Sequence, residues 1–161
     1  MLREPRAGRA FEVLIGLSAA ERKQLVVVTD NPCPEYAMDL LALGPGALFF
    51  GASPTPWEIA GVLESINAGT PQLSPPVFIS NLLPSERAIL RFLPSGECDK
   101  RIARALGLSH RTVRNRLASI LEKLHLENRT QVAMYYSGQW QWLPRYREAL
   151  KLNCTGASLE A

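Results

Sequence analysis

Four side chains that can donate hydrogen bonds to nucleic-acid bases lie within six positions of this 161-residue chain, at Arg111, Arg114, Asn115 and Arg116. Arginine suits the edge of guanine and asparagine suits the edge of adenine, and both also bind phosphate oxygens. On a helix, most of this group shares one side with Ala118, which lies a further turn along. The types and spacing therefore predict a helix that presents its N-terminal half to duplex DNA.

The elements needed to position that helix have the spacing of a helix-turn-helix. Asp99 is expected to cap a first short helix, Gly107 to end it in the left-handed conformation, and Ser109 to cap the second helix. Ala103, Gly107 and Val113 form an Ala-x3-Gly-x5-Val pattern, which lets two helices cross closely over one tight turn. The alternative is two packed helices of any helical domain with solvated arginines. The second helix has an apolar stripe of Val113, Leu117, Ile120, Leu121 and Leu124.

Charge is divided sharply along the chain, although the net charge is only +3. Residues 24–82 contain no Lys or Arg and carry a net charge of −5, whereas residues 83–138 carry +5. Such a division predicts two modules with different partners. The expected organisation is a first segment at 1–69, a Pro-containing linker at 70–82, a helical DNA-binding domain at 83–138 and a C-terminal tail at 139–161, with one more helix from Arg145 to Leu152.

The first segment has the pattern of an α/β fold. Residues 25–28 and 47–50 are continuous apolar runs closed by turn residues, which is typical of strands buried on both faces of a parallel sheet. Helical spacing precedes, separates and follows these two strands, at 9–23, 35–43 and 55–69. In the first of these helices Phe11, Leu14 and Ile15 are expected to face inward. The fold class is thus two parallel strands with helices, followed by an all-α domain of four helices.

The helical domain resembles the LuxR-type DNA-binding domain of the GerE/FixJ class across roughly residues 75–140. The resemblance rests on Leu82 to Gly96, Asp99-Lys100-x-Ile102-Ala103, Leu108-Ser109-x-x-Thr112-Val113-Arg114, Ile120-x-x-Lys123-Leu124 and Asn128-Arg129-Thr130. It implies that the third helix enters the major groove and that the fourth, at 130–136, contacts the second copy of a homodimer. The implied base-facing residues are Arg114, Asn115 and Ala118. The implied phosphate-side residues are Arg111, Thr112 and Lys123, with Arg116 at a position where His is common, and Lys100 and Ser109 are further phosphate-contact candidates.

The first segment resembles the last two βα units of a response-regulator receiver of the NarL/FixJ class. The matching stretches are residues 26–29, 34–44 and 48–54, and residues 69–75 resemble the junction to the output domain. Of the groups that receivers use for phosphorylation, only the hydroxyl has a counterpart, at Thr29, because Phe50 stands at the Lys position. The acceptor Asp is expected at or before Met1 and the acidic pair outside the chain, so no phosphoacceptor is predicted. We expect a truncated receiver with one exposed sheet edge.

The sequence lacks the residues that several other kinds of site require. His110 and His125 have no Cys or carboxylate cluster at metal-ligand spacing, and no cofactor motif is present, so neither a metal site, a cofactor nor catalysis is expected. The three cysteines form no pairing pattern, no apolar run of 18 residues exists, and the N-terminus lacks a signal peptide. These features predict a cytoplasmic protein with no membrane partner.

The expected function is therefore that of a duplex-DNA-binding transcription regulator without a phosphorylation switch. An interaction module is the alternative, in which residues 24–69 bind or titrate another regulator. A phosphotransfer enzyme is a more distant possibility.

Overall fold

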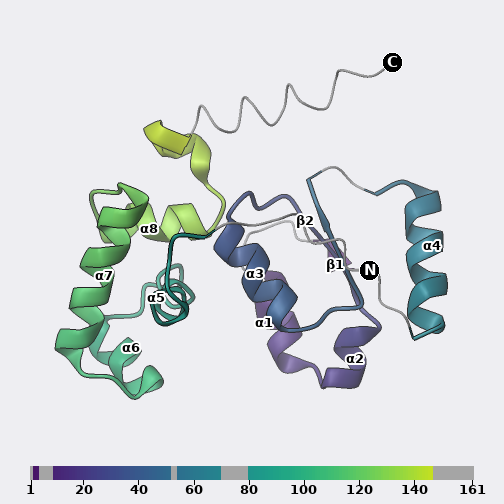
Figure 1. Ribbon diagram of the computed structural model, residues 1–161, viewed down its shortest axis with the longest axis horizontal. Helices are drawn as coiled ribbons and strands as arrows, with labels where there is room; N and C mark the ends of the chain where they lie inside the picture. Colours follow the sequence, from purple (N-terminus) through teal and green to yellow (C-terminus); the bar gives the residue numbers. More distant parts are fainter. Residues whose placement is uncertain (1, 4–8, 52–53, 70–79, 147–161) are drawn as a thin grey trace. The chain divides into compact units, whose positions relative to one another are not determined.

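The structure is a computed structural model that describes residues 2–3, 9–51, 54–69 and 80–146. The chain divides into two compact units, residues 1–79 and residues 80–161. Figure 1 shows the helices and strands of both units, and each unit is considered by itself. Residues 70–79, which form most of the predicted linker, and residues 147–152 of the predicted last helix lie outside the described residues. Helical backbone is present at 144–146, where the description of the second unit ends.

The first unit is built on a parallel sheet with strand order β1-β2-β3. The two predicted strands are present as β2 (Val26–Thr29) and β3 (Ala47–Phe50), which pair in the register Val26 with Ala47 and Thr29 with Phe50. The third strand, β1 (Leu2–Arg3), pairs with β2 on its other side. The expectation that this edge of β2 is open was therefore wrong. Two residues are too short to give a periodic sequence signal.

The segment predicted as one helix at 9–23 is two helices, α1 (Arg9–Gly16) and α2 (Ala19–Lys23). The first helix ends at Gly16, and Ser18 caps the second. The Ser18 side chain accepts a hydrogen bond from the Glu21 N–H, while the Glu21 carboxylate accepts one from the Ser18 N–H. This capping box stabilises a new helix start inside the periodic pattern. The two later helices of this unit are α3 (Pro34–Ala42) and α4 (Pro56–Asn67).

Helices cover both faces of the sheet, with α4 on one side and α1 and α3 on the other (Figure 1). Val62 of α4 packs in a cluster with Val26 and Ala47. On the opposite side, Leu14 of α1 is fully buried, as predicted, but Ile15 is 56% exposed. The inward side of α1 instead combines Leu14 with Ala10, which lies four residues earlier and is also fully buried.

The second unit has the four predicted helices, with α7 as the longest. Its core contains apolar side chains from all four, and the fourth helix buries Val132 and Tyr136, with Ala133 half-buried. The helices are α5 (Pro84–Leu90), α6 (Asp99–Leu106), α7 (His110–Leu124) and α8 (Arg129–Tyr136), followed by the short 3-10 helix η1 (Trp140–Trp142).

Aromatic side chains close the second unit behind α8. Trp140 stacks on Tyr135 with ring centroids 5.3 Å apart, and its indole N–H donates to the Tyr135 carbonyl at 2.9 Å. The Tyr146 hydroxyl donates to the Leu124 carbonyl at 2.7 Å and so anchors this segment to the end of α7. Trp142 remains 68% exposed. Among the described helices, none combines the length and apolar character required to cross a membrane.

Gly46 gives a direct test of the first unit. A Cβ at this position would overlap the carbonyl oxygen of Lys23 and approach Ile66 Cδ1 to 2.9 Å. We expect Gly46→Ala to lower the free energy of unfolding of the first unit by about 1–3 kcal/mol. The loss should appear as faster hydrogen exchange at the β2 amides.

Gly61 provides the matched control, because a Cβ there meets nothing within 4 Å in the middle of α4. Gly61→Ala should raise the free energy of unfolding by about 0.5–1 kcal/mol, since alanine is the better helix former. Equal effects of the two substitutions would contradict the packing around Gly46.

Candidate nucleic-acid interface

The corner between α6 and α7 has the predicted geometry. Gly107 adopts the left-handed conformation with φ of 64°, and the Leu108 N–H donates to the Ala103 carbonyl at 2.8 Å. The Ser109 hydroxyl accepts a hydrogen bond from the Thr112 N–H at 3.0 Å and so caps α7. The left-handed glycine and this cap fix where α7 begins, and therefore which of its residues face solvent.

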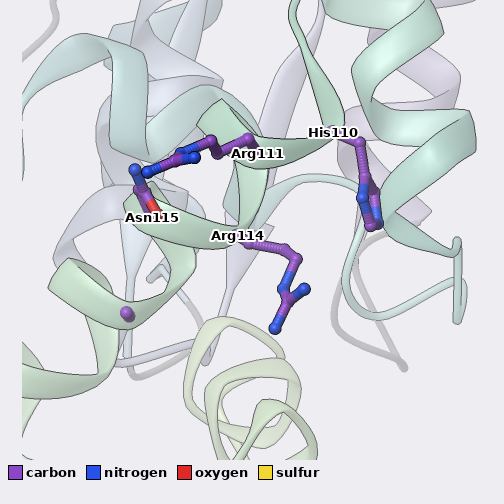
Figure 2. A pocket seen from close by; sticks show the side chains of 5 residues that line it. His110, Arg111, Arg114 and Asn115 are labelled. Atoms are coloured by element: carbon purple, nitrogen blue, oxygen red, sulfur yellow. The ribbon is translucent and has the colours of Figure 1, made fainter.

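Helix α7 has one buried side and one exposed side. Val113, Ile120 and Leu124 are buried, and Leu117 and Leu121 are half-buried. The opposite side lines a surface hollow of about 490 Å³ (Figure 2). In Figure 2 Arg111 and Asn115 extend toward one another, whereas Arg114 points in a different direction. The residues that line the hollow are His110, Arg111, Arg114, Asn115 and Ala118, all of them exposed.

Lys123 does not join this exposed group. Its ammonium group contacts both carboxylate oxygens of Glu86 on α5, at 2.8 and 2.9 Å. Glu86 is 3% exposed and also accepts hydrogen bonds from the Ser119 hydroxyl and the Leu83 N–H, each at 2.8 Å. Moving Lys123 to a phosphate would leave a buried carboxylate without its cation. Lys123 therefore helps to hold α7 on α5, and a phosphate contact by Lys123 stays a prediction.

This environment lowers the pKa of Glu86. Burial alone would raise it, but the hydrogen bonds from Lys123, the Leu83 N–H and Ser119 outweigh burial. The same carboxylate supplies half of a capping box at α5, where Leu83 has no side-chain group to offer the Glu86 N–H. One buried charge thus caps the Leu83 N–H at the start of α5, where Leu83 has no capping side chain, and also fixes the two helices together.

The other predicted contact residues occupy varied surroundings. Lys100 and Ser109 are exposed, and Thr112 is half-buried with its hydroxyl 2.8 Å from the Ser109 hydroxyl. Arg116 is half-buried and donates to the Ser85 carbonyl at 3.4 Å, so part of its hydrogen-bonding capacity is used within the domain. Lys100 and Ser109 thus have the exposure that a phosphate contact needs, while Arg116 partly supports the α5–α7 contact.

Asp99 has a role that sequence reasoning missed. It is the first residue of α6 and not its cap, because Cys98 occupies the cap position. Its carboxylate pairs with Arg129 at 2.5 Å and lies 3.8 Å from the imidazole of His110. Arg129 also donates to the Glu97 carbonyl. The sequence signal that could have found this cluster is that Asp99, His110 and Arg129 each lie at or within one residue of a predicted helix start.

Comparison with known proteins agrees with this geometry. The family model described as bacterial regulatory proteins, luxR family, matches residues 80–136. The transcriptional regulatory protein DesR of Bacillus subtilis is 28% identical over 127 residues, which cover 72% of this chain and 63% of DesR. The DNA-binding transcriptional activator DevR/DosR of Mycobacterium tuberculosis is 39% identical over 57 residues, 35% of this chain and 26% of that protein.

The match to DesR is longer than the whole second unit, so it includes part of the first unit. A structure of RcsB from Salmonella enterica serovar Typhimurium bound to promoter rprA has 24% sequence identity and a TM-score of 0.35, with 71% of this chain and 60% of that chain covered. This chain spans less than two thirds of the length of these curated relatives. The region that matches the family model lies in the second unit.

Glu86→Gln tests the buried ion pair. The substitution keeps the size of the side chain but leaves the Lys123 ammonium without a carboxylate, so we expect the free energy of unfolding of the second unit to fall by about 3 kcal/mol. Urea unfolding followed by the fluorescence of the buried Trp140 measures the change. Glu122→Gln on the exposed side of α7 is the control and should have little effect.

The same pair has a defined pH dependence. Because folding lowers the pKa of Glu86, its stabilisation is present above the unfolded pKa of about 4.3 and is lost as the pH falls through the folded pKa. The difference between wild type and Glu86→Gln should therefore shrink in acid. A difference that grows below this range would contradict the assignment.

Proposed function

Taking the helix-turn-helix domain of the LuxR family at residues 80–136 as the starting point, we propose that this protein is a sequence-specific transcription regulator that binds duplex DNA. The observation that carries the proposal is the exposed stripe on α7 from His110 to Ala118. Neighbouring polar groups of α7 are engaged inside the domain, as the contacts of Lys123 and Ser119 with Glu86 illustrate. The exposed arginines and asparagine are left to contact an external partner.

In the proposed mechanism α7 enters the major groove with its N-terminal half. Arg114 and Asn115 contact base edges, and Ala118 lies beside them at the base surface. Arg111, Thr112, Lys100 and Ser109 contact phosphates, where the positive end of the α7 dipole adds to the attraction. Arg116 contributes at most a secondary phosphate contact because it also bonds to Ser85. Phosphate contacts set the position of α7, and the base contacts determine the sequence.

A homodimer is part of this proposal. Two copies would place two α7 helices in successive turns of the major groove and bind two half-sites about one turn of DNA apart. Helix α8 contributes the contact, although Val132 and Tyr136 are already buried in the core of their own unit. The interface must therefore use the outer side of α8, which includes the exposed Thr130 and the half-buried Met134.

We further infer that the first unit acts without phosphotransfer. Thr29 carries a receiver-like hydroxyl, but Thr29 is only 1% exposed and its hydroxyl accepts a hydrogen bond from the Asn31 N–H. Across the β2–β3 register Thr29 faces Phe50, so an apolar ring stands where receivers carry Lys. Without that cation the site has little to neutralise a phosphoryl group. We thus propose that the protein is a cytoplasmic regulator and not an enzyme.

A second candidate function is an interaction module, in which residues 24–69 bind or titrate another regulator. The observation that favours it is the surface of α4, where Trp57 is 87% exposed and Leu63 is 47% exposed. Exposed large apolar side chains on one helix are a common feature of protein interaction sites. The two functions make opposite predictions for the exposed stripe of α7.

Arg114→Ala distinguishes the two functions. If Arg114 contacts a base, the substitution should weaken binding to the preferred duplex by about 1–3 kcal/mol and relax the preference at one base pair. The preferred duplex is first selected with the wild-type chain from a random library, and affinity is then measured by fluorescence anisotropy. Unchanged affinity of Arg114→Ala would favour the interaction module.

Lys100→Ala is the matched comparison, because Lys100 is exposed at the start of α6 and is proposed to contact phosphate. It should weaken binding to all duplexes about equally and reduce the salt dependence by roughly 0.9 in the slope of log affinity against log salt. The same pattern for both variants would contradict base recognition by Arg114.

A further inference from the structure

The first residues of three helices meet at one carboxylate. Asp99 begins α6, His110 begins α7 and Arg129 begins α8. One oxygen of Asp99 pairs with Arg129 Nη1 at 2.5 Å, and the other lies 3.8 Å from His110 Nε2. Asp99 also lies in the first turn of α6, where the partial positive charge of that helix N-terminus favours an anion.

His110 faces two environments at once. On one side is Asp99, and on the other is the hollow on α7 that His110 lines together with Arg111 and Arg114 (Figure 2). Its side chain is 48% exposed, so a ligand in the hollow can reach it. When His110 is protonated, its positive charge therefore forms part of the proposed DNA surface.

The charged groups around His110 oppose one another. The anionic group is Asp99 on α6, whose carboxylate lies 3.8 Å from the imidazole. The cationic groups are Arg111 and Arg114 on α7, with which His110 lines the hollow, and Arg129 on α8, which pairs with Asp99. A phosphate group in the hollow would offset the arginines and leave the attraction to Asp99. Binding of DNA should therefore draw a proton onto His110.

We propose that His110 couples duplex binding to proton uptake, with the imidazolium bridging Asp99 and a DNA phosphate. This inference rests on the proposed DNA-binding function and adds regulation of the same surface by pH. Histidine is the side chain whose charge most readily changes near neutral pH. Because the complex binds the extra proton, affinity rises as the pH falls.

The sequence provides a matched control, since it contains two histidines. His125 is exposed at the opposite end of α7, where it caps the helix in the left-handed conformation with φ of 52°. Asparagine tolerates this conformation, so His125→Asn removes the second imidazole with little backbone strain. His110→Gln removes the first at an exposed position and keeps a polar side chain.

The experiment measures binding of the full chain to a labelled mixed-sequence duplex of roughly 30 base pairs, long enough for two half-sites one turn apart. From about pH 8 to about pH 6 at constant ionic strength, we expect the dissociation constant of wild type to fall roughly three- to tenfold. The salt dependence should also steepen by about 0.9 at the lower pH, because one more phosphate is neutralised. His110→Gln should abolish both effects, and His125→Asn should preserve them.

Asp99→Asn tests the bridge, with urea unfolding as a check that the domain remains folded. It should reduce the change of affinity with pH, since the imidazolium loses its carboxylate. Retention of the full pH dependence in His110→Gln, or its absence in wild type, would overturn the proposal while leaving DNA binding intact. A lack of duplex binding by wild type at every pH would instead overturn the proposed function on which it rests.

Discussion

The second unit depends on a buried ion pair that fixes its longest helix. Glu86 is almost completely removed from solvent, yet its carboxylate receives Lys123, the Ser119 hydroxyl and the Leu83 N–H. A buried charge is tolerated only when it is paired and hydrogen-bonded in this way. Because two of these partners lie on α7 and the third precedes α5, satisfying the charge also determines how α7 rotates about its own axis. That rotation decides which side chains are exposed.

A carboxylate lies at each end of α7, and each carboxylate engages particular basic residues of the domain. Glu86 engages Lys123 toward the C-terminal end, and Asp99 engages Arg129 and approaches His110 at the N-terminal end. The cations that remain on the surface stripe are Arg111 and Arg114. The net charge of +5 over residues 83–138 therefore does not show how the charges are arranged. Acidic residues engage particular basic residues and leave the proposed DNA surface positive.

Local signals in the sequence were sufficient to predict the helix-turn-helix. They were insufficient to predict the contacts between residues far apart in the sequence. Gly107 and Ser109 act on neighbouring backbone groups, so their types alone predicted the corner. The contact of Lys123 with Glu86 was not predicted, because Glu86 lies 37 residues away and a helical pattern does not reveal such a pair. The short strand β1 was missed for the same reason, since its pairing with β2 and not its own two residues defines it.

Both units bury charged side chains as well as apolar ones. In the first unit Val26 and Val27 lie at the centre of a sheet covered by helices on both faces, and α3 also buries the carboxylates of Glu35 and Asp39, each 1% exposed. In the second unit the buried charge differs in what it positions, because Glu86 pairs with Lys123 of α7 and Asp99 lies beside His110, the first residue of that helix. Contacts between charged groups weaken when one partner is removed or when salt screens them. A change that weakens these two contacts should therefore alter the position of α7, which carries the proposed DNA surface.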